Sequence, residues 1–213
     1  MNIVVLISGN GSNFQAIIDA VETGTINATI TAVVSNRSDA FGLQRAAKHN
    51  IPQIILDHTG YPDREQFDLA MQNAIDQCDP DLVVLAGFMR ILTDQFVQHY
   101  QGRLINIHPS LLPKFKGLNT HQRAIEAGEK QHGCSVHYVS AELDSGAVIG
   151  QARVTIEHDD DAASLAARVQ TAEHRLYPTC IKLICEGKIK LSPNGVVQGT
   201  HILPEQGLDL TEE

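Results

Sequence analysis

Residues 2–21 read NIVVLISGNGSNFQAIIDAV, and this stretch decides the class of fold. Its first part, Ile3 to Ile7, is a run of apolar and mostly β-branched residues, which is typical of a buried parallel strand. The glycines within Ser8 to Asn13 permit a sharp turn, and Asn13 to Val21 has the apolar spacing of a helix. A strand, a glycine-rich turn and a helix in direct succession predict the first repeat of an α/β protein.

The same alternation continues as far as His108. Further strands are predicted at residues 29–34, 52–56, 81–86 and 103–108, and helices at residues 41–49, 63–78 and 93–100. Because parallel strands need crossover helices, this rhythm predicts a doubly wound, mostly parallel open sheet of the Rossmann-like kind.

After His108 the pattern changes. A helix is predicted near residues 121–127, and strands at 132–139 and 147–156 predict an antiparallel hairpin at the sheet edge. A last helix carries the apolar stripe from Leu165 to Leu183, and Pro178 is expected to kink it. A polar tail is predicted over residues 192–213. Because the chain has no internal repeat and no linker, we expect a single domain over residues 1–213.

The chain has 16 Lys and Arg against 25 Asp and Glu, a net charge of −9 over 213 residues. This charge argues against binding to nucleic acids or anionic membranes, because their phosphates would be repelled over most of the surface. The apolar run at the start is too short for a signal peptide or a membrane span, which favours a cytoplasmic protein. Four cysteines at irregular spacing favour free thiols over a disulfide framework or a four-thiolate zinc site.

The turn Ser8-Gly9-Asn10-Gly11-Ser12-Asn13 could bind an anion, because backbone amides at a helix start point outward. It does not match the dinucleotide fingerprint, since Phe14 occupies the third glycine position. The lysine of a P-loop is also missing. A phosphate monoester therefore fits the turn better than NAD or ATP, and a plain turn with a Ser or Asn cap is the alternative.

Asn106 and His108 end the strand predicted at residues 103–108, where alternation places both side chains on one face. The carboxyl ends of strands in open α/β sheets are where ligands bind. An amide donor beside an imidazole suits stabilisation of an oxyanion and transfer of a proton. The turn Glu142-Leu143-Asp144-Ser145-Gly146 could bring a carboxylate against His108 and stabilise its protonated form.

Weaker signals have structural alternatives. His132, Cys134 and His137 suggest a metal site, yet strand alternation separates His137 from the other two, so no metal is predicted. Gln170 and Glu173 lie one turn apart on the last helix, where a solvated face is the simpler interpretation.

Several segments together resemble the folate-dependent formyltransferases. They are ISGNGSN (7–13), VVLAGFMRIL (83–92), INIHPSLLP (105–113), HGCSVHYV (132–139) and ELDSG (142–146). SGNGSN, QTAEH (170–174) and the chain length narrow the resemblance to the branch that acts on glycinamide ribonucleotide. The resemblance implies formyl transfer from 10-formyltetrahydrofolate to the amine of that nucleotide, in purine biosynthesis and without a metal.

Carried over residue by residue, the resemblance implies Asn106, His108 and Asp144 as the catalytic set. The nucleotide would be held by Gly11, Ser12, Asn13, Gln170, Thr171, Ala172 and Glu173. The folate would be held by Arg64, Met89, Arg90, Ile91, Leu92, Asn106, Ser140, Ala141, Glu142, Leu143 and Asp144. The half of the domain near residues 1–100 would then bind phosphate, and residues 101–190 would carry catalysis and folate binding.

The sequence departs from the family pattern at Ser145, where a glycine is expected, at Cys134, where a threonine is expected, and in the loop Gly117 to His121. Three alternatives remain open. A methionyl-tRNA formyltransferase would carry an RNA-binding domain, and a formyltetrahydrofolate hydrolase would carry an additional N-terminal domain. A nucleotide-binding module or NAD oxidoreductase is opposed by Phe14 and by Ser35-Asn36, where an acid would be expected.

Overall fold

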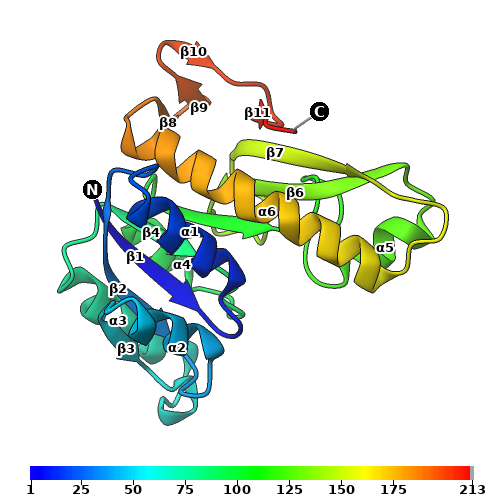
Figure 1. The fold of residues 1–213 in the computed structure, drawn as a ribbon. Helices are drawn as coiled ribbons and strands as arrows, with labels where there is room; N and C mark the ends of the chain where they lie inside the picture. The colour runs from blue at the N-terminus through cyan, green and yellow to red at the C-terminus, as the bar shows by residue number, and fades with distance from the viewer. Residues whose placement is uncertain (212–213) are drawn as a thin grey trace. The chain divides into compact units, whose positions relative to one another are not determined.

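The computed structural model describes residues 1–211 and has the predicted α/β architecture. Its strands form an open, mostly parallel sheet of eight strands and a separate antiparallel sheet of three (Figure 1). The chain divides into two compact units, one from Met1 to Asn106 and one from Ile107 onward. The fold class expected from the sequence is confirmed.

The first unit alternates strands and helices. Its elements are β1 (Asn2–Ile7), α1 (Ser12–Glu22), β2 (Thr29–Ser35), α2 (Phe41–Lys48), β3 (Gln53–Ile55), the 3₁₀ turn η1 (His58–Gly60), α3 (Arg64–Asp76), β4 (Leu82–Leu85), α4 (Asp94–His99) and β5 (Leu104–His108), whose last two residues belong to the second unit. The strands lie in the order β5-β4-β1-β2-β3, and every pairing is parallel. Ile3 to Ile7 are completely buried in the centre, which explains their continuous apolar character.

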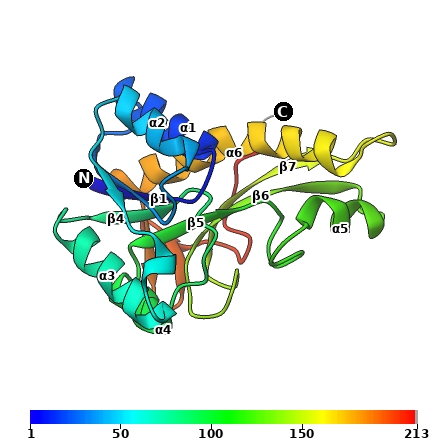
Figure 2. The same cartoon turned by 90° about the horizontal axis from the view of Figure 1, so that it is seen from below.

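Side-chain caps fix where two helices of this unit begin. The Asp63 carboxylate accepts from the backbone N–H of Gln66 at 2.8 Å, and the Thr93 hydroxyl accepts from Phe96 N–H at 3.3 Å. Both bonds satisfy amides that lack a partner within their own helix. Helices α3 and α4 therefore begin at set positions, and they pack side by side (Figure 2).

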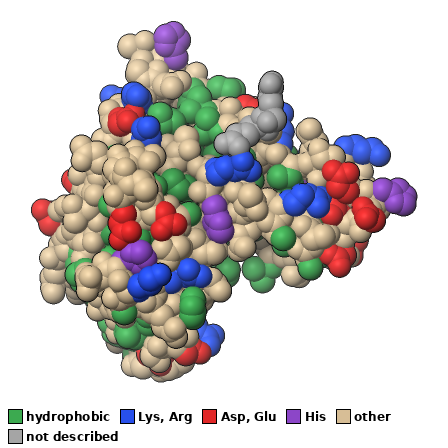
Figure 3. Space-filling view, in the orientation of Figure 1, with side chains coloured by type: hydrophobic (Ala, Val, Ile, Leu, Met, Phe, Trp, Pro, Cys, Tyr) green, Lys and Arg blue, Asp and Glu red, His purple; other side chains and the backbone are tan. Residues whose placement is uncertain are grey.

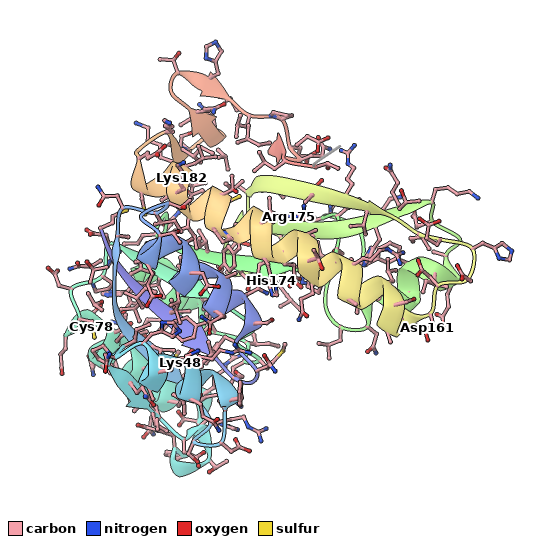
Figure 4. All side chains as sticks on the ribbon, in the orientation of Figure 1. Lys48, Cys78, Asp161, His174, Arg175 and Lys182 are labelled. Atoms are coloured by element: carbon pink, nitrogen blue, oxygen red, sulfur yellow. The ribbon has the colours of Figure 1, made fainter. Side chains whose placement is uncertain are left out.

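The second unit is built on an antiparallel pair. It contains α5 (Thr120–Glu126), β6 (Gln131–Tyr138), β7 (Val148–Thr155), α6 (Ala162–Cys185), β8 (Ile189–Ser192), β9 (Gly195–Gln198), β10 (His201–Ile202) and β11 (Leu208–Asp209). Helix α6 packs along β6 and β7 (Figure 1). It begins with a capping box between Asp161 and Ser164, has Lys182 in its last turn (Figure 4), and continues through Pro178 without interruption.

The segment after Ser192 adds to one prediction and corrects another. The predicted polar tail contains β9 and β10, which form the antiparallel sheet together with β8. Strand β11 pairs with β7, so the β6–β7 hairpin does not form the edge of the large sheet. The strands β10 and β11 have two residues each, too short for a periodic pattern to show in the sequence. Residues 212–213, the end of the predicted tail, lie outside the described residues.

Composition led us to expect no membrane-spanning segment, free cysteines and a surface of mixed charge with an acidic excess. Within residues 1–211, no helix is long and apolar enough to cross a membrane. No disulfide joins the four cysteines, all of which lie in the described part of the chain. On the face drawn in Figure 3, Lys and Arg side chains are interspersed with Asp and Glu.

Candidate active site

The turn between β1 and α1 is shaped by glycine rather than by a capping side chain. Gly11, with φ 72° and ψ 33°, occupies the N-cap position of α1, so the alternative of a Ser or Asn at that position is not what the structure shows. A Cβ on Gly11 would lie 2.9 Å from Cα of Gly42, because α2 approaches the turn closely. Only glycine combines this positive φ with the close approach.

Two polar side chains hold this turn in place. Arg45 donates from Nε to the Asn10 carbonyl and from Nη2 to the Asn10 side chain, both at 3.0 Å. Buried Ser8 donates to Asn36 Oδ1 at 2.6 Å and accepts from Met89 N–H at 2.8 Å. Arg45 adds positive charge beside the predicted anion site, and sequence reasoning missed it because α2 lies distant in the chain.

Two of the predicted folate residues of the first unit, Arg64 and Arg90, interact with a buried carboxylate. Asp68 is 2% exposed and accepts from Thr93 N–H at 2.6 Å. Burial raises the pKa of Asp68, while the Thr93 bond and the charges of Arg64 and Arg90 oppose the rise. The structure therefore brings Arg64 and Arg90 to one carboxylate that the sequence did not single out.

The loop before α4 exposes two apolar side chains on either side of Arg90 in the sequence. Met89 and Ile91 are 73% and 61% exposed, whereas Leu92 is buried. The guanidinium of Arg90 lies 5.6 Å from the ring centre of Phe67, and its Nε is buried without a hydrogen-bond partner. Exposed apolar side chains next to an unsatisfied donor suit a flat ligand with a polar edge.

His108 faces two oxygen acceptors. Its Nε2 lies 3.0 Å from the Phe115 carbonyl oxygen, and its Nδ1 lies 3.5 Å from Asp144 Oδ2. Because a carbonyl oxygen only accepts, Nε2 carries a proton in this arrangement. Asn106 lies two positions earlier on β5, so alternation places its side chain on the same face of the strand. The expected approach of a carboxylate to His108 is confirmed.

Asp144 is held by the backbone on one side and faces a second imidazole on the other. Its side chain is 8% exposed, and Oδ2 accepts from Gly117 N–H at 2.9 Å. Its Oδ1 lies 3.9 Å from Nε2 of His137, whose Nδ1 lies 2.9 Å from the Tyr138 carbonyl. Burial lowers the pKa of His137, which favours its neutral form. Sequence reasoning missed His137 as a neighbour of Asp144, because the two residues belong to different elements, and the β6–β7 pairing is irregular between Val136 and His137.

Two further histidines lie behind the loop that follows His108. The rings of His121 and His132 are 5.2 Å apart, and neither Nδ1 of His121 nor Nε2 of His132 has a hydrogen-bond partner. Burial lowers the pKa of His132 to about 4. Within residues 1–211, no group of three or more His, Cys, Asp or Glu side chains is arranged to hold a metal ion. Whether the protein works without a metal stays a prediction.

The predicted nucleotide residues on α6 are divided between surface and interior. Gln170 and Thr171 are exposed, and Ala172 and Glu173 are buried. The simpler interpretation of a solvated face is therefore wrong for Glu173. Buried carboxylates in folded proteins are paired with polar or charged groups, so the burial of Glu173 favours a specific role. Residues 11–13 belong to the first unit and residues 170–173 to the second.

The chain is similar to proteins of known function along nearly its whole length. The family model described as formyl transferase matches residues 1–181. Phosphoribosylglycinamide formyltransferase from Escherichia coli is 52% identical over 97% of this chain and 98% of its own, and the Haemophilus influenzae protein of that name is 45% identical over 96% and 97%. A human protein named trifunctional purine biosynthetic protein adenosine-3 is 42% identical over 92% of this chain and 19% of its own length.

The solved structures point to the same group. A structure of phosphoribosylglycinamide formyltransferase from Coxiella burnetii has a TM-score of 0.95, 49% identity and 98% coverage of both chains. One of glycinamide ribonucleotide transformylase 1 from Symbiobacterium toebii has a TM-score of 0.90 at 40% identity, with 93% of each chain covered. The fold, the His108–Asp144 pair and these matches together show that the chain belongs to the formyl transferase family.

Proposed function

We propose that this protein transfers the formyl group of 10-formyltetrahydrofolate to the amine of glycinamide ribonucleotide, a reaction of purine biosynthesis, in the cytoplasm. The observation that carries the proposal is the contact between His108 and Asp144 at the end of β5, two residues after Asn106. Relatives that share about half of the residues along nearly the whole chain bear the name of this activity, which supports the substrate assignment. The two compact units then serve one formyltransferase domain.

The catalytic roles follow from the donors that this pair offers. As the substrate amine adds to the formyl carbon, negative charge develops on the formyl oxygen, and the Asn106 amide donates to it. The 3.5 Å between His108 Nδ1 and Asp144 Oδ2 is longer than an N–H···O hydrogen bond, so the Nδ1 proton is not held in a short bond. That proton is available to the charged oxygen and to the folate nitrogen that leaves. The proton lost by the attacking amine replaces the one given to the folate nitrogen, and the Asp144 carboxylate faces the imidazole as it gives and regains this proton.

The binding roles follow the charges and the exposed apolar groups. Gly11, Ser12 and Asn13 bind the phosphate at the start of α1, with Arg45 supplying charge nearby. Gln170, Thr171, Ala172 and Glu173 contact the rest of the nucleotide. Arg64 and Arg90 pair with the folate carboxylates, and Met89, Ile91 and Leu92 contact its ring system, together with the segment Ser140 to Asp144. No metal enters this scheme.

One assay with two arms tests the proposal. The purified protein is given 10-formyltetrahydrofolate with and without glycinamide ribonucleotide, and both the formylated nucleotide and the released folate are quantified. Turnover that requires the nucleotide is expected, with His108→Ala and Asn106→Ala lowering kcat by about 10²- to 10⁴-fold and changing KM little. Equal folate release in both arms would instead indicate the hydrolase, and no turnover in either arm would refute the enzyme assignment.

The metal prediction has a separate test. Dialysis against a chelator should leave the rate unchanged, because the proposed chemistry needs only Asn106, His108 and Asp144. Loss of activity that zinc restores would contradict this and would bring His132 and Cys134 back as candidate ligands.

A further inference from the structure

The main chain from Phe115 to Leu118, called here the 115–118 segment, contacts both members of the His108–Asp144 pair. The carbonyl of Phe115 lies 3.0 Å from Nε2 of His108, and the N–H of Gly117 donates to Oδ2 of Asp144 at 2.9 Å. These two backbone atoms lie on either side of Lys116. A movement of this short segment therefore shifts the imidazole and the carboxylate together.

The segment has a backbone conformation that it would not keep unaided. Phe115 has φ 53°, which is rare for a residue with a bulky side chain, and Gly117 and Asn119 have φ 77° and 55°. Residues in such conformations persist only where the surrounding structure holds them. The 115–118 segment must therefore be held from outside.

Arg123 on α5 supplies the first of two ties. Its Nη1 donates to the carbonyls of Lys116 and Leu118 at 2.6 and 3.2 Å, and its guanidinium lies 5.5 Å from the ring centre of Phe115. One rigid group thus contacts three of the four residues. The planar guanidinium suits this task, because it can donate in fixed directions and lie over an aromatic ring at the same time.

Lys116 supplies the second tie, on the side of Asp144. Its Nζ donates to the Ser145 hydroxyl and to Glu142 Oε1, the latter at 3.4 Å. Both partners belong to the turn that carries Asp144, whose own φ is 48°. Ser145 is one of the positions where the sequence departs from the family pattern, so this tie is not one that the resemblance would supply.

We infer that Arg123 and Lys116 are positioning residues that fasten the 115–118 segment from two sides and thereby orient His108 and Asp144. Neither touches the imidazole or the Asp144 carboxylate, and both act through the backbone of Phe115 and Gly117. The kinetic consequence rests on the proposed function, whereas the orientation of His108 can be measured without it.

The first experiment replaces Arg123 and uses its neighbour as control. Arg123→Met removes every donor, Arg123→Lys keeps the charge, and Gln122→Ala removes an exposed side chain that bonds only to Glu126 on the same helix. Three quantities are measured for each: the ¹⁵N signals of the His108 ring, assigned with His108→Ala, the kinetic constants, and the urea midpoint. For Arg123→Met we expect a mixed His108 tautomer signal and a kcat lowered by about 10- to 100-fold, with KM changed less and the urea midpoint near that of Gln122→Ala. Arg123→Lys should recover part of the loss.

The same measurements can overturn the inference. If Arg123→Met leaves the His108 signals and kcat like those of Gln122→Ala, Arg123 positions nothing. If its kcat falls only in proportion to a loss of folded protein, its role is stability alone. If the unmodified protein shows no formyl transfer, the proposed function fails, but the ¹⁵N signals still decide whether Arg123 orients His108.

A double-variant cycle tests the second tie. Lys116→Met and Ser145→Ala each remove one end of the same contact, so the double variant should lose no more kcat than Lys116→Met alone. Losses that multiply would show that the two residues act independently and would refute the tie.

Discussion

Nδ1 of His108 lies 3.5 Å from Oδ2 of Asp144, and that same oxygen accepts the backbone N–H of Gly117 at 2.9 Å. One carboxylate oxygen thus faces a backbone donor and the imidazole at once. The backbone bond fixes the direction of the carboxylate, and its negative charge faces the imidazole.

We therefore expect the rate of formyl transfer to depend more on the negative charge of Asp144 than on the shape of its side chain. Asp144→Asn keeps an oxygen for Gly117 N–H but removes the negative charge beside His108. We expect kcat for formyl transfer to fall by about 10²- to 10⁴-fold with little change in KM. Asp159→Asn, which removes an exposed charge before α6, is the matched control. A rate for Asp144→Asn equal to that of Asp159→Asn would remove Asp144 from the mechanism.

Acid should destabilise the protein through His132. Its pKa is about 4 in the folded protein, below the ordinary value of about 6.5, because the ring is buried. Between these values the unfolded chain binds a proton that the folded protein does not, so the stability present above pH 6.5 is lost as pH falls toward 4. The loss attributable to this group is roughly 3 kcal/mol.

Urea unfolding at pH 7.5, 5.5 and 4.5 measures this loss. His132→Leu is expected to have a free energy of unfolding that depends less on pH over that range, whatever its stability at pH 7.5. Parallel curves for the variant and the unmodified protein would show that His132 is not the group responsible.

Substitutions at two glycines with nearly the same φ can distinguish backbone strain from steric crowding. Gly11 and Gly24 have φ 72° and 73°, but a Cβ on Gly24 meets nothing within 4 Å, whereas one on Gly11 would lie 2.9 Å from Gly42 Cα. We expect Gly24→Ala to cost about 1 kcal/mol, and Gly11→Ala about 2 to 3 kcal/mol because the backbone of α2 must move as well. Urea unfolding of both variants measures the difference.

The same pair tests the proposed phosphate site. Calorimetry should show weaker binding of glycinamide ribonucleotide to Gly11→Ala and unchanged binding to Gly24→Ala. If both variants bind alike, the turn at Gly11 does not hold the phosphate.

A charged carboxylate at position 68 should destabilise the folded protein more than a neutral amide at the same position. Its pKa is raised by burial, so the folded protein binds a proton more readily than the unfolded chain, and stability is lost as pH rises through that raised pKa. Asp68→Asn removes this cost and keeps an acceptor for Thr93 N–H. We expect it to be at least as stable as the unmodified protein at pH 7.5.

Asp68→Ala is the companion variant. It leaves the Thr93 N–H without its partner and should lose about 1 to 3 kcal/mol in urea unfolding. Equal losses in the two Asp68 variants would mean that the charge, through Arg64 and Arg90, stabilises the fold more than its burial opposes it.

Local patterns predicted most of the architecture. The apolar run Ile3 to Ile7 is buried throughout, and the elements up to β7 begin and end within a few residues of where periodicity placed them. The short strands after Ser192 escaped prediction, because β11 exists only through its pairing with β7. The burial of Glu173 was also missed, since a carboxylate at the flank of an apolar stripe gives no sign in the sequence of what packs over it.

By itself, the sequence determined the α/β class and the family, and it singled out His108 as a candidate catalytic residue, because strand periodicity and short motifs are properties of neighbouring residues. Only the tertiary structure decided which groups surround that imidazole. Asp144 faces it from a turn at positive φ, His137 lies on the other side of that carboxylate, and Arg123 bonds to the backbone of the 115–118 segment that contacts both His108 and Asp144. Such contacts join residues far apart in the chain. They form only when the free energy gained by packing offsets the conformational entropy lost in bringing those residues together.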